Sequence, residues 1–283
     1  MLKGPFLSKN WMCACKTYQE ADWVMLGLPF DGTCSNKPGT RFASQTIRTA
    51  SWGLEEYSPV VDRDFNDVKF FDAGDLEFPL GNREKTLQQI ENNVMDALND
   101  DKKTFCIGGE HLVTLPQIKA YTQKFKNLQV VHFDAHCDLR EDYLGEKLSH
   151  ACVMRRIVEI VGAENLHQIG IRSGEKTEFE WVNVYNTLIK NMADASKIFE
   201  SFGTKPVFIT VDVDVLDPSI MAGTGTQEAG GMTFNELIEW LLLLRGQNVV
   251  GMDLVELSPD YDFSGASTAV AAKLAREMLI YFG

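Results

Sequence analysis

The 283-residue sequence predicts an α/β fold built on a parallel sheet. Short apolar runs rich in β-branched residues recur along the chain, and longer amphipathic stretches separate them, as is typical of βα units. Hydrophobic residues make up 45% of the chain and charged residues 24%, proportions that supply a large buried core. There is no internal repeat, low-complexity tract or linker. Because α/β sheets of this length often form one unit, we expect residues 1–283 to form a single domain.

The predicted strands are the short apolar, β-branched runs. They occupy residues 23–28, 68–72, 104–107, 129–133, 167–171, 206–213 and 249–254. The predicted helices are the amphipathic stretches between and after these runs. They occupy residues 82–99, 115–124, 150–161, 177–185, 194–202, 233–244 and 267–281.

The charge and cysteine content exclude several classes of protein. Forty acidic and 27 basic side chains give a net charge of −13, which repels nucleic acid and attracts a small cationic substrate or a divalent metal. The six cysteines show no paired C-x-x-C spacing, so we expect reduced thiols; Cys13 and Cys15 lack the second pair that a zinc site needs. No apolar run approaches the roughly 20 residues of a membrane span. We therefore expect a cytoplasmic protein without nucleic-acid or membrane partners.

Metal-binding side chains follow three of the predicted strands, at the sheet edge where α/β folds bind ligands. GGEH follows residues 104–107, DAHCD follows residues 129–133, and VDVD lies at the end of residues 206–213. Carboxylates that converge from two strand ends repel one another unless cations lie between them. The six predicted metal ligands are His111, Asp134, His136, Asp138, Asp212 and Asp214.

Four aspartates and two histidines suit Mn²⁺ better than a structural zinc ion. Six ligands exceed the need of one ion, so we expect two ions about 3.5 to 4 Å apart that share a water, which ionises near neutral pH and becomes a nucleophile. His132 and His167 are expected to pack in strands or beside ligands rather than to bind metal. Asp217, which precedes Pro218, is expected to cap a turn.

These residues resemble the ureohydrolase superfamily of arginases, agmatinases and formimidoylglutamases over nearly the whole chain, and agmatinases most closely. The matching segments begin with GLPFDGT at Gly27 and continue with PGTRF, GLEEYSP, FDAGD, GGEHLV, FDAHCDLR, LSH, GIRSG, VDVDVLDPS, GTGTQEAGG and DLVELSPDYD. The resemblance implies a three-layer α/β/α domain with an eight-stranded, mostly parallel sheet. It also implies a homo-oligomer, trimeric or hexameric.

The resemblance further implies a role for each site residue. One Mn²⁺ would bind His111, Asp134, Asp138 and Asp212, and the other Asp134, His136, Asp212 and Asp214. His150 would be the proton shuttle and Glu256 the carboxylate that grips the planar guanidinium, so both contact the substrate and, with Asp138, count as catalytic. The glycine-rich segment GTGTQEAGG is expected to line the site.

The expected reaction is hydrolysis of agmatine to putrescine and urea by a metal-bridging hydroxide, with His150 protonating the leaving amine. Alternatives within the superfamily are a guanidinobutyrase, an arginase or a formimidoylglutamase. Formimidoylglutamases generally lack a histidine at the position of His150. A catalytically silent metal-binding homologue is a further alternative, against which the complete set of site residues argues.

Agmatine is expected to be preferred over arginine. Arginases hold the α-carboxylate of arginine with an asparagine and a serine in the loop before the shuttle histidine. Here that loop, residues 139–149, instead contains Glu141, Asp142 and Glu146. Arg140 directly follows the ligand run, so we interpret it as a structural residue.

Overall fold

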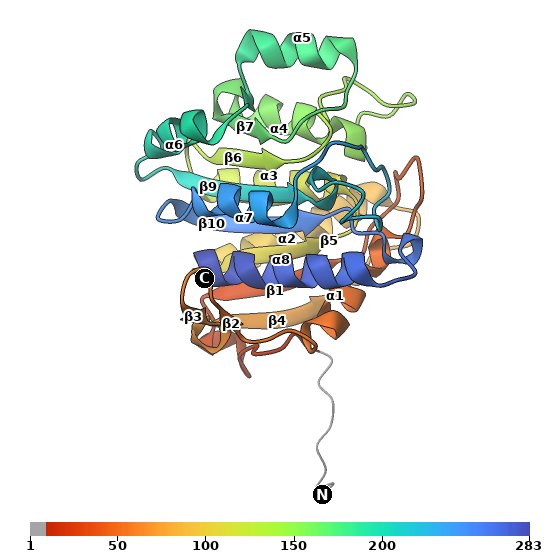
Figure 1. Cartoon of the computed structure of the whole chain (residues 1–283). Coiled ribbons are helices and arrows are strands. Elements are labelled where there is room, and N and C mark those ends of the chain that lie inside the picture. Colours follow the sequence, from red (N-terminus) through yellow and green to blue (C-terminus); the bar gives the residue numbers. More distant parts are fainter. Residues whose placement is uncertain (1–9) are drawn as a thin grey trace, which may run out of the picture.

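The structure, a computed structural model, describes residues 10–283 and is built around an eight-stranded sheet (Figure 1). The strand order is β4-β1-β5-β10-β9-β6-β7-β8, and every pairing is parallel, which confirms the predicted sheet. The strands are β1 (Trp23–Leu28), β4 (Phe70–Asp75), β5 (Lys103–Gly108), β6 (Gln129–Phe133), β7 (Leu166–Ile169), β8 (Leu188–Ile189), β9 (Pro206–Asp212) and β10 (Asn248–Val255). A separate antiparallel pair joins β2 (Tyr57–Ser58) to β3 (Arg63–Asp64).

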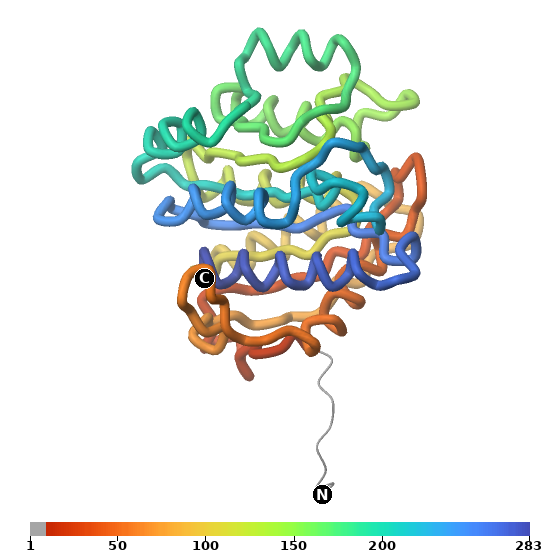
Figure 2. The backbone as a smooth tube through the Cα atoms, in the orientation of Figure 1, coloured from red at the N-terminus to blue at the C-terminus, as the bar shows by residue number. Residues whose placement is uncertain are grey.

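Helices cover both faces of the sheet, so the molecule has the expected three layers (Figure 2). One layer contains α1 (Ala43–Ser51), α6 (Met192–Glu200), α7 (Phe234–Leu242) and α8 (Ala266–Phe282). The other contains α2 (Arg83–Asn99), α3 (Thr114–Lys124), α4 (Val153–Val161) and α5 (Lys176–Tyr185).

The two cores follow from the alternation of side chains along each strand. In β1, Met25 packs into the core under α1 and α8, whereas Val24 and Leu26 pack into the core under α2 and α3. Both faces are buried, which explains why the strands read as continuous apolar runs rather than as an alternating pattern.

The predicted elements agree closely with the structure, but helix α1 and the short strands β2, β3 and β8 were missed. Strands β1 and β6 have the predicted bounds, and the predicted helix 150–161 begins as a 3₁₀ turn before α4. Strand β8 is only two residues long. Helix α1 contains one large apolar residue, Ile47, and buries small residues together with Arg48, which pairs with Asp72 at 2.8 Å. Its packing against α8 is a tertiary effect that local periodicity does not predict.

Other expectations bear on the chain as a whole. The six cysteines are free thiols. Within residues 10–283, no helix combines the length and the apolar composition needed to cross a bilayer. The single-domain assignment stays a prediction, and its first nine residues lie outside the described part of the chain.

Candidate metal centre and active-site pocket

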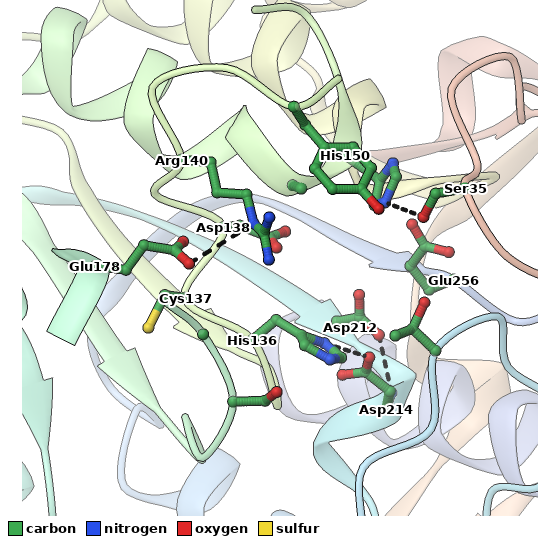
Figure 3. Close-up of a pocket in the computed structure, with 15 residues that line it drawn as sticks. Ser35, His136, Cys137, Asp138, Arg140, His150, Glu178, Asp212, Asp214 and Glu256 are labelled. Carbon is green, nitrogen blue, oxygen red and sulfur yellow. Dashed lines mark hydrogen bonds and ion pairs between the residues drawn. The ribbon is translucent and has the colours of Figure 1, made fainter. Parts of the chain in front are cut away.

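The carboxyl ends of β5, β10, β9 and β6 lie side by side and bring the predicted site residues together. His111 follows β5, Glu256 follows β10, and Asp212 is the last residue of β9. Figure 3 shows the side chains around one pocket, with His136, Asp212 and Asp214 grouped together, Asp138 beside Arg140, and His150 and Glu256 completing the ring.

His111 lies at the centre of this cluster and is almost completely buried. Its Nδ1 is 3.1 Å from Asp134 Oδ2 and 3.3 Å from both Asp138 Oδ2 and Asp212 Oδ2. Its Nε2 is 3.0 Å from Thr210 Oγ1. When Nε2 donates its hydrogen to Thr210, Nδ1 presents a lone pair to three carboxylate oxygens. Among residues 10–283, Nδ1 finds no hydrogen-bond partner, and this arrangement fits a cation between these groups.

Asp134 connects His111 to the second half of the cluster. Its Oδ2 faces His111, whereas its Oδ1 is 3.5 Å from His136 Nδ1. His136 Nδ1 is also 2.9 Å from Asp214 Oδ2. Donor atoms therefore form two groups that share Asp134, one with His111 and Asp138 and the other with His136 and Asp214. A carboxylate with one oxygen in each group suits a pair of ions.

The pKa values of the aspartates also indicate that cations bind in this cluster. Burial and then the charge of Asp134 raise the pKa of Asp138 to about 7. Burial and the adjacent Asp214 raise the pKa of Asp212 well above its usual range. Without bound cations these carboxylates resist ionisation together, and a divalent metal removes that penalty. The donor set, which is rich in oxygen with two imidazoles, fits Mn²⁺.

His132 lies within the first donor group, yet both of its ring nitrogens already have partners. Gln168 Nε2 lies 3.2 Å from His132 Nδ1, and the same amide donates to the Cys137 carbonyl. Nδ1 is therefore the acceptor, so His132 Nε2 carries the hydrogen that it donates to Asp134 Oδ2 at 2.8 Å. His132 therefore holds the Asp134 carboxylate in place. His167 packs against Phe202, with ring centroids 4.8 Å apart.

Two site residues other than glycine adopt left-handed backbone conformations. Asp138 has a φ of 53° and Glu256 a φ of 68°. Such conformations cost about 1 to 3 kcal/mol each and persist only where surrounding contacts hold them. For Glu256 these contacts are a hydrogen bond from its own N–H to the Gly109 carbonyl at 2.9 Å and one from the His111 N–H to its Oε1 at 2.7 Å.

A pocket of about 180 Å³ opens over the cluster. It is lined by predicted ligands, by His150 and Glu256, and by residues that the sequence analysis did not select. The latter are Ser35, Cys137, Arg140, Tyr143, Ala151, Ser173, Gly174 and Glu178. Thr226 also lines the pocket and belongs to the glycine-rich segment, which therefore lines the site as predicted. Asp217 caps a turn, also as predicted, because its carboxylate accepts the Ser219 N–H at 3.0 Å.

The loop between the metal ligands and His150 differs from the sequence interpretation. Its acidic residues do not line the pocket: Glu141 pairs with Arg155 at 2.9 Å, and Glu146 pairs with Arg83 at 2.9 Å. Arg140, which we interpreted as structural, does line the pocket. Its guanidinium lies 4.9 Å from the centre of the Tyr143 ring. No local pattern in the sequence distinguishes a residue that faces the pocket from one that faces the surface in this loop.

The parallel α/β/α fold thus carries buried aspartates and histidines at the carboxyl edge of its sheet, in two donor groups that suit a pair of metal ions. The family model of arginases matches residues 21–281, so the chain belongs to the arginase family. It is 44% identical over 271 residues to an agmatinase of Bacillus cereus, covering 93% of each chain. It is 43% identical over 282 residues to an agmatinase of Bacillus subtilis, covering 98% of this chain and 97% of the relative. The crystal structure of the agmatine ureohydrolase of Thermoplasma volcanium superposes with a TM-score of 0.87 at 33% identity, over 98% of this chain and 95% of that one.

Proposed function

We propose that this chain hydrolyses agmatine to putrescine and urea. The observation that carries the proposal is the buried cluster in which His111 Nδ1 faces three carboxylate oxygens, a site that fits a divalent cation. The similarity to agmatinases along almost the whole chain supports agmatine as the substrate. A small dication also matches the net charge of −13.

The proposed cofactor is two Mn²⁺ ions per chain. His111, Asp134, Asp138 and Asp212 would hold one ion, and Asp134, His136, Asp212 and Asp214 the other. When bound, the ions would lower the pKa of a water in the pocket so that it is a nucleophile near neutral pH. The protein would supply the remaining steps through Glu256 and His150.

Glu256 would bind the guanidinium. Its Oε1 is held by the His111 N–H, which leaves Oε2 free for the substrate. Burial and the charge of Glu110 raise the pKa of Glu256 well above its usual range. A guanidinium cation would offset both effects, because it brings a positive charge and a fork of N–H donors to the carboxylate. Binding would therefore be coupled to full ionisation of Glu256.

His150 would carry the proton. Burial lowers its pKa to about 4, so the imidazole is neutral near pH 7 and can accept before it donates. We infer that its Nε2, 3.4 Å from Ser35 Oγ, takes a proton from the attacking water and gives it to the leaving amine. The amine would then leave as a neutral molecule rather than as a poor anion.

A second candidate substrate is 4-guanidinobutyrate. Arg140 presents a guanidinium to the pocket, and a cation there favours a carboxylate at the far end of the substrate. Glu175, 2.7 Å from Arg140, and Glu178, 3.8 Å away, offset this charge. We therefore rank agmatine first.

The test is urea release from Mn²⁺-loaded protein, with agmatine, 4-guanidinobutyrate and arginine at equal, subsaturating concentration, together with formamide release from formimidoylglutamate. Agmatine should give the highest kcat/KM. The matched control is Asp134→Asn, which should release no urea above background from any of them. Faster cleavage of 4-guanidinobutyrate would transfer the assignment to the second candidate, and an inactive, metal-loaded wild type would indicate a silent homologue.

We also propose a cytoplasmic homo-oligomer, trimeric or hexameric, without nucleic-acid or membrane partners. The superfamily resemblance and the acidic composition support this assembly and location. Sedimentation equilibrium would measure the oligomeric state, and a monomer would contradict the proposal.

A further inference from the structure

Glu110, a carboxylate outside the predicted ligand set, lies beside His111 and is completely buried. Both of its oxygens accept hydrogen bonds from Thr33. The Thr33 N–H donates to Oε2 at 2.7 Å, and the Thr33 hydroxyl donates to Oε1 at 2.5 Å. The loop that carries Thr33 can approach this closely because Gly109 has no side chain, since a Cβ there would lie 1.8 Å from the Phe30 carbonyl oxygen.

Thr33 in turn contacts His150 at two points. Its Oγ1 accepts the His150 backbone N–H at 3.1 Å and lies 3.4 Å from His150 Nδ1. A threonine hydroxyl has one hydrogen to donate and two lone pairs that accept. An ionised Glu110 has no hydrogen to give and takes that of the Thr33 hydroxyl, so the hydroxyl can only accept at His150.

The hydrogen bonds of the Thr33 hydroxyl decide which ring nitrogen of His150 carries the hydrogen. Nδ1 must be the donor to Thr33, so in the neutral ring Nε2 has the lone pair. Nε2 is the nitrogen on the pocket side, where it lies 3.4 Å from Ser35 Oγ (Figure 3). The Tyr143 ring contacts His150 edge-on at 5.6 Å and limits its rotation.

We propose that Glu110, acting through the Thr33 hydroxyl, is a positioning residue that fixes the tautomer of His150 with hydrogen on Nδ1 and a free lone pair on Nε2. Its importance for turnover rests on the proposed function, because the lone pair on Nε2 is what His150 needs to accept a proton in the pocket. The tautomer itself is independent of the substrate.

The discriminating variant is Glu110→Gln, which keeps the shape of the side chain. The Thr33 N–H can only donate, so the glutamine oxygen must accept it and the glutamine NH₂ must donate to Thr33 Oγ1. The Thr33 hydroxyl hydrogen then turns to His150 Nδ1. The Thr33 N–H, the Thr33 hydroxyl and His150 Nδ1 each keep a partner, yet the tautomer of His150 reverses.

The experiment is ¹⁵N NMR of histidine-labelled full-length protein, loaded with diamagnetic Mg²⁺, with His150 assigned by its loss in His150→Ala. In the wild type, Nδ1 should be pyrrole-type and Nε2 pyridine-type. Glu110→Gln should exchange these types, Thr33→Ser should retain the wild-type pattern, and Thr33→Val should give a mixture. The surface variant Glu84→Gln serves as the control and should leave the spectrum unchanged.

Kinetics on the Mn²⁺-loaded enzyme gives the second readout. Glu110→Gln should lower kcat roughly 10- to 10⁴-fold, the range seen when a catalytic imidazole loses its function or its tautomer, with KM within about threefold. Hydrogen on Nε2 in the wild type, or an unchanged pattern in folded Glu110→Gln, would overturn the inference. If Glu110→Gln does not fold, the wild-type spectrum and Thr33→Val still decide. Full kcat in His150→Ala would instead overturn the proton-shuttle role and leave the tautomer assignment standing.

Discussion

Replacing Thr210 with valine should weaken metal binding without touching a ligand. Thr210 is completely buried in β9, and its hydroxyl is the partner of His111 Nε2 at 3.0 Å. Valine preserves the shape of the side chain and removes this acceptor. The buried His111 Nε2–H would then lack an acceptor, which costs about 1 to 3 kcal/mol of folding free energy. Loss of the partner that orients a metal-binding histidine typically reduces metal affinity roughly 10- to 100-fold, or about 1.4 to 2.8 kcal/mol.

The assay is calorimetric titration of Mn²⁺ into metal-stripped protein, for the wild type and Thr210→Val. The matched control is Thr122→Val, which removes a hydroxyl that bonds only within α3, to the Ile118 and Lys119 carbonyls. Thr122→Val should keep the wild-type Kd. If Thr210→Val also binds Mn²⁺ within about twofold of the wild type, Thr210 does not orient His111 and the assignment of Nδ1 as a ligand atom loses its support.

Chelation should abolish activity, and Asp134→Asn should reduce metal content more than His111→Ala does, because Asp134 contacts both donor groups; equal losses by elemental analysis would contradict the bridge. His150→Ala should lower kcat roughly 10- to 10⁴-fold at unchanged metal content, and an unaltered kcat would mean that another group supplies the proton. Agmatine should exceed arginine in kcat/KM by roughly 10², because Glu175 already pairs with Arg140 and offsets the charge that an α-carboxylate would need; turnover of arginine within a few-fold of agmatine would refute this. Hydrogen bonds from Ser264 and Ser267 lower the pKa of Asp262 to about 2. The ionised Asp262 therefore stabilises the folded state above about pH 4, and this contribution is lost as the pH falls toward 2. The Tm difference between wild type and Asp262→Asn should shrink over that range, and a constant difference would refute the prediction.

Much of the fold is encoded locally and was predictable. Strands β1 and β6 are continuous apolar runs, and their bounds follow from composition alone. Helix α1 was not predictable, because the burial of Arg48 depends on Asp72, which lies 24 residues further along the chain. Local patterns describe segments that bury apolar surface and do not describe segments held by distant ion pairs.

The candidate site was likewise predictable only where its residues lie in local motifs. The predicted metal ligands follow strands in short motifs, so their clustering could be expected from a parallel sheet. The contact between Glu110 and Thr33 was not predicted, because the two residues are 77 positions apart and meet only through the packing of a loop against Gly109. The direction in which Arg140 points depends on Glu175 and Tyr143, which the loop sequence does not reveal.

The central claim is that this chain is a binuclear manganese enzyme that cleaves agmatine. The most direct measurement combines product analysis with metal analysis on one sample of Mn²⁺-loaded protein. Agmatine should yield urea and putrescine in equal amounts, at full activity only with two Mn²⁺ per chain. Full activity with one ion or none, or release of urea without putrescine, would contradict the claim.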